Sequence, residues 1–158
     1  MATTNSWRGD RRHVLVIEQE TAVLEQLSQL LDEADCTFSC CTTTEAALSS
    51  AQAAAPDMLI ADVAFGQMGG AVLYDEIRAR AGVRKLPVVF LCREQGPDII
   101  RRHHADTGAY YVRKPFDSRA LLELTRCTLN QHRAKHLPKP LASCSAPPAQ
   151  EDEARSNR

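Results

Sequence analysis

The sequence lacks the features that mark several common classes of protein. Only 5% of its 158 residues are aromatic, and no apolar run approaches the length of a membrane span, which is about 20 residues. Residues 1–10 place no apolar stretch behind a basic start, so we expect no signal peptide. The formal net charge of -1 offers no bulk attraction to nucleic acid or to an anionic membrane. These absences predict a cytoplasmic protein with neither a nucleic-acid nor a membrane partner.

Cysteine, by contrast, is plentiful. Six cysteines form an even set, which in a secreted chain would suggest disulfides. Without a secretion signal, we expect reduced thiols that are mostly buried. The close group of Cys36, Cys40 and Cys41 has neither a CxxC spacing nor a neighbouring histidine, so it does not predict a zinc site.

Short apolar runs alternate with segments whose apolar residues recur every three or four positions. The runs predict buried strands, and the recurring spacing predicts amphipathic helices. Such alternation is typical of a parallel sheet with right-handed crossovers and helices on both faces. We therefore expect a doubly wound, flavodoxin-like α/β domain with a five-stranded parallel sheet in the order 2-1-3-4-5. The expected strands cover 13–17, 36–41, 56–62, 86–91 and 108–113.

The helix expected between the fourth and fifth strands has the weakest pattern. Gly96-Pro97-Asp98 suits a helix start, because proline in the first turn loses no hydrogen bond. Ile99 and Ile100 give this helix only a narrow apolar contact, and the residues from Arg101 to His104 are expected to face water.

The ends of the chain differ in composition from its middle. Residues 1–11 are polar and predict a disordered lead, whereas residues 12–136 carry the whole strand and helix pattern. Residues 137–158 turn to Pro, Ala and Ser and then to acids, which predicts a disordered tail. We expect no output domain after residue 136.

Polar side chains follow three of the expected strands. Glu18 and Gln19 follow the first strand, Asp62 ends the third, and Lys114 follows the fifth. In the predicted strand order, the first and third strands flank the switch point, where ligands bind in open α/β sheets. No GxGxxG or Walker loop is present, and acids at the first turn favour a cation over a nucleotide phosphate. Carboxylates suit Mg²⁺, and a lysine can pair with phosphoryl oxygens.

Four motifs extend this pattern over residues 12–134 and resemble the receiver domain of bacterial two-component response regulators. They are Val14-Leu15-Val16-Ile17-Glu18, then Pro56-Asp57-Met58-Leu59-Ile60-Ala61-Asp62 with Met68 and Gly70 after it, Pro87-Val88-Val89-Phe90-Leu91, and Lys114-Pro115-Phe116.

The resemblance implies a role for each site residue. Asp62 would accept a phosphoryl group from a histidine kinase or a phosphotransfer protein, and Lys114 would contact that group. The Mg²⁺ ligands would be Glu18, Gln19, Asp62 and the backbone carbonyl of Ala64. The peptide bond between Lys114 and Pro115 would be cis. Tyr111 would be a switch residue.

Four positions depart from the family pattern. One is Gly66, which replaces a proline that is usual in the turn after Asp62 and so loosens that loop. Gln19 stands where an aspartate is usual, which removes one negative charge from the metal site. Glu20 follows directly, but we do not count it among the ligands. Cys92 replaces the Ser or Thr that contacts the phosphoryl group and drives the switch, and a thiol is a weaker donor. Arg93 replaces a small residue; it would either crowd Asp62 or supply positive charge.

These observations leave two functional hypotheses. The first is a single-domain, phospho-accepting response regulator that signals by binding an unknown partner. Its switch would act on a face formed by the helix over 96–104, the strand over 108–113 and the last helix. The second is a pseudo-receiver, a protein-interaction module that acts without phosphorylation. Neither is an enzyme beyond self-catalysed phosphoryl transfer and hydrolysis. A flavodoxin-like cofactor enzyme would need a Ser/Thr-rich phosphate loop after the first strand, and none is present.

Overall fold

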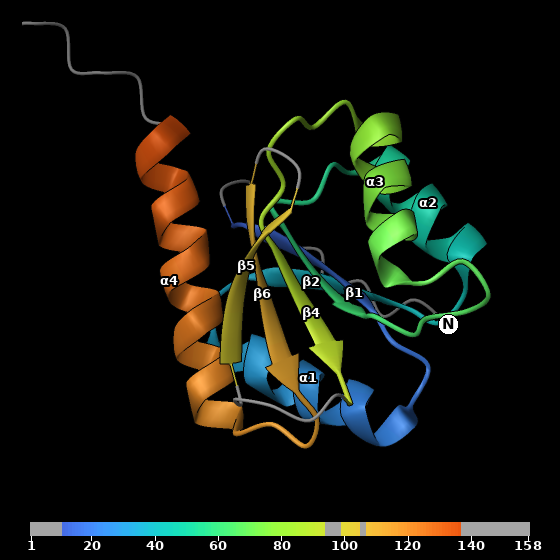
Figure 1. Ribbon diagram of the computed structural model, residues 1–158. Helices are drawn as coiled ribbons and strands as arrows, with labels where there is room; N and C mark the ends of the chain where they lie inside the picture. Colours follow the sequence, from blue (N-terminus) through green and yellow to red (C-terminus); the bar gives the residue numbers. More distant parts are fainter. Residues whose placement is uncertain (1–10, 94–98, 105–106, 137–158) are drawn as a thin grey trace, which may run out of the picture.

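A sheet with helices on both faces forms the core of the computed structural model, which describes residues 11–93, 99–104 and 107–136 (Figure 1). Among these residues, no helix is both long and apolar enough to cross a membrane. The predicted lead, apart from Arg11, and the predicted tail lie outside the described residues. The helices and strands in chain order are β1 (His13–Ile17), α1 (Thr21–Glu33), β2 (Thr37–Cys41), α2 (Thr44–Ala53), β3 (Met58–Asp62), α3 (Gly70–Ala81), β4 (Val88–Cys92), β5 (Ile99–His104), β6 (Thr107–Arg113) and α4 (Ser118–His136).

The sheet has the strand order β2-β1-β3-β4-β6-β5. Its first five strands in that order are parallel to one another, which confirms the predicted 2-1-3-4-5 arrangement. In the register of β1 and β3, Ile17 lies opposite Ala61. The next residue of each strand is therefore at the same level of the sheet, so Glu18 and Asp62 leave neighbouring strands side by side.

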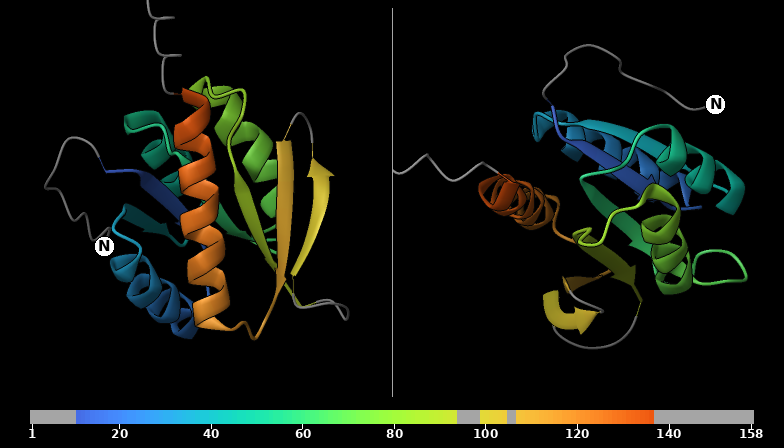
Figure 2. Two further views of the ribbon diagram at one scale, coloured as in Figure 1. Left: turned by 90° about the vertical axis from the view of Figure 1, so that its left-hand side faces the viewer. Right: turned by 90° about the horizontal axis from the view of Figure 1, so that it is seen from above.

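The central strands are buried on both faces, as their continuous apolar runs predict. On β1, Leu15 and Ile17 belong to the core layer that includes α2 and α3, whereas Val14 and Val16 belong to the layer that includes α1 and α4. All four side chains have no exposed surface. Figure 2 shows the two helix pairs on opposite faces of the sheet. Burial of each such side chain contributes about 1.5–3 kcal/mol, so these strands anchor the polar residues at their ends.

The prediction of a helix from Gly96 to His104 is wrong for residues 99–104, the part of this segment that the structure describes. Residues 99–104 form β5, which pairs antiparallel with β6 at the edge of the sheet (Figure 1). The two isoleucines that open this segment are β-branched and favour extended backbone, and no apolar stripe of helical period follows them. Pairing with β6 gives one side of the β5 backbone its hydrogen-bond partners. The predicted switch face consequently has a strand where we expected a helix.

Candidate functional site

Asp62 lies at the end of β3 with both carboxylate oxygens engaged. Oδ1 accepts a hydrogen bond from the backbone N–H of Ala64 at 2.8 Å, which holds the carboxylate against its own turn. Oδ2 accepts from Nζ of Lys114, also at 2.8 Å. The Asp62 side chain is 18% exposed, so it remains accessible from solvent.

Glycine at position 70 allows the turn after Asp62 to close. A Cβ at this position would lie 2.2 Å from the backbone carbonyl oxygen of Asp62, a distance that no real contact reaches. The Gly70 N–H donates to the carbonyl of Val63 at 2.9 Å. The start of α3 is thereby packed directly on the backbone that presents Asp62.

Glu18 is a fully buried carboxylate beside Asp62. Its Oε1 accepts backbone hydrogen bonds from Gln19 at 2.8 Å and from Glu20 at 3.0 Å. Its Oε2 lies 2.6 Å from Nζ of Lys114, and this ion pair is its only polar contact among the described residues. A buried carboxylate is costly unless it is paired, so Glu18 depends on Lys114.

Lys114 contacts the carboxylates of both Glu18 and Asp62. It follows β6, its backbone N–H donates to the carbonyl of Cys92 at 2.7 Å, and its side chain is only 7% exposed. The bond to Pro115 is cis, as the resemblance implied. Burial works to lower the pKa of Lys114, but hydrogen bonds to Asp62 and Glu18 outweigh it, and the pKa is raised. The lysine is therefore a fixed positive charge at physiological pH.

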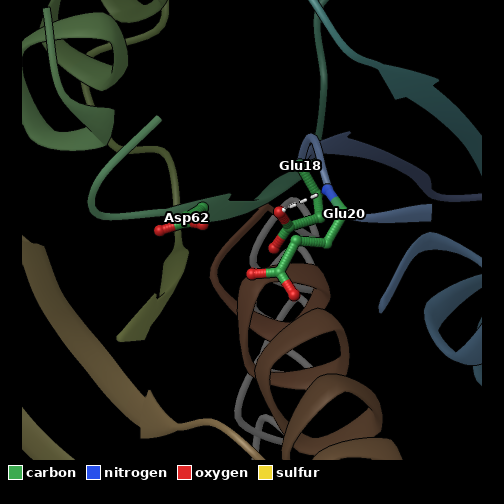
Figure 3. Close-up of side chains that lie close together, drawn as sticks. All are labelled: Glu18, Glu20 and Asp62. Atoms are coloured by element: carbon green, nitrogen blue, oxygen red, sulfur yellow. Dashed lines mark hydrogen bonds between the residues drawn. The ribbon is translucent and has the colours of Figure 1, made fainter. Parts of the chain in front are cut away.

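Glu20, which we did not count among the ligands, contributes the third carboxylate. Side-chain oxygens of Glu18, Glu20 and Asp62 all lie within 4.8 Å of one another, and Figure 3 shows the first two projecting from the same turn. Glu20 Oε1 lies 3.4 Å from Nζ of Lys114 and also pairs with the guanidinium of Arg93. The hydrogen bond from Arg93 holds the pKa of Glu20 below its usual value.

The donor set fits the divalent cation implied by the resemblance. Three carboxylates converge, and hard cations such as Mg²⁺ prefer oxygen ligands with a few waters. Among the described residues, the Oε2 atom of Glu18 contacts only the Lys114 ammonium, so its second lone pair retains capacity for a cation. Glu18, Glu20 and Asp62 are the residues of this cluster that would hold the ion.

The other predicted site residues do not belong to the cluster of carboxylates. Gln19 and Ala64 are exposed, and their roles as metal ligands stay predictions. Cys92 is half-buried, and its thiol makes a weak hydrogen bond to the carbonyl of Val112, 3.7 Å away on β6. Tyr111 packs on the Phe90 ring, with centroids 5.2 Å apart. The phosphoryl-contacting role of Cys92 and the switch roles of Cys92 and Tyr111 also stay predictions.

Comparison with solved structures shows what this fold resembles. The chemotaxis protein CheY4 of Vibrio cholerae has a TM-score of 0.63 and 21% identity, over 75% of this chain and 98% of that one. The signal receiver domain of an HD domain-containing protein from Pseudomonas fluorescens Pf-5 has a TM-score of 0.65 and 20% identity, over 78% and 98%. A CheY-like receiver domain protein from Methanospirillum hungatei JF-1 gives 0.63 and 18%, over 80% and 99%. Identities this low establish the fold alone.

The comparison of sequences identifies the family. The search of curated proteins finds no match. The family described as the response regulator receiver domain matches residues 14–126, which is more than half of the chain. This range begins within β1 and ends within α4, so it includes Glu18, Asp62 and Lys114. The chain therefore belongs to the response regulator receiver domain family.

Proposed function

We propose that this receiver accepts a phosphoryl group on Asp62 and signals by binding a partner protein. Receiver domains are signalling domains that interact with histidine kinases or phosphotransfer proteins and bind Mg²⁺ at an acidic site. The observation that carries the proposal is the ion pair of Lys114 with both Asp62 and Glu18, at 2.8 and 2.6 Å. It holds a nucleophile, a cation and a second carboxylate in one partly accessible site.

In the proposed reaction a carboxylate oxygen of Asp62 attacks the phosphorus of a phosphohistidine. A P–O bond forms, the P–N bond breaks, and the imidazole nitrogen leaves with the electron pair and takes a proton from solvent. Lys114 lies within hydrogen-bond distance of the attacking carboxylate and stabilises the charge on the transferred group as a point charge. A bound Mg²⁺ would neutralise phosphoryl charge during transfer.

The second candidate is the pseudo-receiver, which binds partners without phosphorylation. Two observations favour it. The Arg93 guanidinium already pairs with a carboxylate of the site. In addition, the thiol of Cys92 is directed at a carbonyl of β6. Both observations concern residues around Asp62, whereas Asp62 and Lys114 themselves are in place.

The experiment that separates the two candidates is incubation with acetyl phosphate and Mg²⁺, followed by intact-mass measurement. We expect one phosphoryl adduct on the wild-type protein and none on Asp62→Asn. Wild-type protein without an adduct, or an equal adduct on the variant, would reject phosphorylation of Asp62 and leave the pseudo-receiver. A phosphorylated histidine-containing phosphotransfer protein as donor then tests transfer from a protein.

A further inference from the structure

The ion pair between Arg93 and Glu20 has no role in the reaction described above. Arg93 follows β4 and Glu20 precedes α1, so the contact joins two separate loops across the mouth of the site. Glu20 belongs to the carboxylate cluster that would hold the metal. The carboxylate oxygen that contacts Arg93 is the same atom that lies 3.4 Å from Lys114. One potential metal ligand is therefore already shared between two protein cations.

We propose that Arg93 is a built-in competitor of the divalent cation, and that metal binding requires Glu20 to exchange Arg93 for the metal. The inference rests on the proposed function, because it concerns the metal site of that function. It assigns Glu20, rather than Gln19, as the metal ligand beside Glu18 and Asp62. It also makes Arg93 a residue that sets the metal affinity.

The charges of the site support this exchange. Glu18, Glu20 and Asp62 carry three negative charges, and Lys114 and Arg93 carry two positive charges, which leaves a net charge of one negative. Affinity for hard cations rises with the negative charge of the ligand set. Loss of Arg93 from the site doubles the net negative charge available to the metal. Lys114 cannot leave in the same way, because it is buried and pairs with Glu18 and Asp62.

Exposure shows which of the two cations is able to exchange. The side chain of Arg93 is 71% exposed and that of Glu20 is 42% exposed, whereas Lys114 is 7% exposed. Ion pairs at such exposed positions are weak and are screened by salt. The pair is thus strong enough to lower metal affinity by a modest factor and weak enough for the metal to open it. The substitution Arg93→Ala is therefore expected to tighten metal binding.

The test measures metal binding directly rather than phosphorylation. Mn²⁺ serves as the probe, because electron paramagnetic resonance reports its free concentration. In the full chain, Arg93→Ala should lower the Kd for Mn²⁺ by roughly two- to five-fold at low salt, the range expected for one exposed ion pair. Glu20→Gln should raise the Kd. In the double variant the gain from Arg93→Ala should disappear, since its target is gone.

Matched controls make each outcome decisive. Arg80→Ala removes another exposed arginine, which pairs with Glu76 on α3, and it should leave the Kd unchanged. An equal effect of Arg80→Ala and Arg93→Ala, or a gain that persists in the Glu20→Gln background, would overturn the inference. So would wild-type and Arg93→Ala proteins that both fail to bind Mn²⁺. Absence of a phosphoryl adduct with an intact Arg93 effect would reject only phosphorylation and leave the competition standing.

Discussion

The ammonium of Lys114 lies 2.6 Å from Oε2 of Glu18 and 2.8 Å from Oδ2 of Asp62. One buried cation thus joins two carboxylates that leave neighbouring parallel strands at the same level of the sheet. Two unpaired carboxylates this close would repel each other, and the lysine removes most of that cost. The proposed reactive site is therefore also a structural contact between β6 and the centre of the sheet.

Replacement of Lys114 should destabilise the fold as well as the proposed chemistry. We expect Lys114→Met to lower the free energy of unfolding by about 3 kcal/mol, because Glu18 is left as a buried carboxylate without a partner. Urea denaturation followed by circular dichroism measures the loss. Addition of Glu18→Gln should restore part of it, since the unpaired charge is then gone. A loss below about 1 kcal/mol would show that Glu18 does not depend on this pair.

The sequence predicted the parallel sheet well because its signals are local and strong. Each central strand is a short, continuous apolar run, and this pattern is typical of strands covered on both faces. The edge of the sheet was predicted less well. At Ile99 and Ile100, two apolar residues do not distinguish a helix from a strand, and the antiparallel pairing with β6 depends on contacts that no local pattern encodes.

For the site, the sequence indicated the strand ends correctly but not how the turn after β1 folds. Glu18, Asp62 and Lys114 lie at the carboxyl ends of strands, so their convergence depends only on strand order. The contribution of Glu20 depends on its backbone N–H bonding back to Glu18, which turns the chain toward the site. A signal was present in two departures from the family pattern, Gln19 in place of an acid and Arg93 in place of a small residue. Both departures make the charge around the site less negative, which indicates that the metal site differs from the usual one.

The close approach of Gly70 to Asp62 predicts a site-specific effect of a single methyl group. Gly70→Ala places a Cβ 2.2 Å from the Asp62 carbonyl oxygen, so the backbone of the turn must shift. We expect a loss of stability of about 1–3 kcal/mol and weaker Mn²⁺ binding, because Asp62 moves with its backbone.

A second glycine provides the control for that experiment. Gly82 ends α3 with a φ of 66°, and no atom lies within 4 Å of a Cβ built there. Gly82→Ala should cost a similar 1–2 kcal/mol through backbone strain alone, but it should leave Mn²⁺ binding unchanged. If both variants lose stability and keep the same metal affinity, the contact between Gly70 and Asp62 does not position the site.

At the opposite end of the sheet, His13 should make stability depend on pH. Its ring nitrogens lie 3.0 Å from Oγ1 of Thr37 and 3.2 Å from Oγ of Ser39, which ties β1 to β2. Burial lowers the pKa of His13 below its ordinary value of 6.5, and the charge of Asp57 opposes this only in part.

The pKa of His13 is lower in the folded protein than in the unfolded chain. As the pH falls, the unfolded chain therefore takes up the proton first. The stabilising contribution of neutral His13 is therefore present above pH about 6.5 and is lost as the pH falls through the folded pKa. Urea denaturation at pH 7.5 and pH 5.5 should show a smaller difference between the two pH values in His13→Gln than in the wild-type protein. Glutamine retains hydrogen-bonding capacity but does not titrate. An identical pH dependence in both proteins would show that His13 titrates alike in the folded and unfolded states.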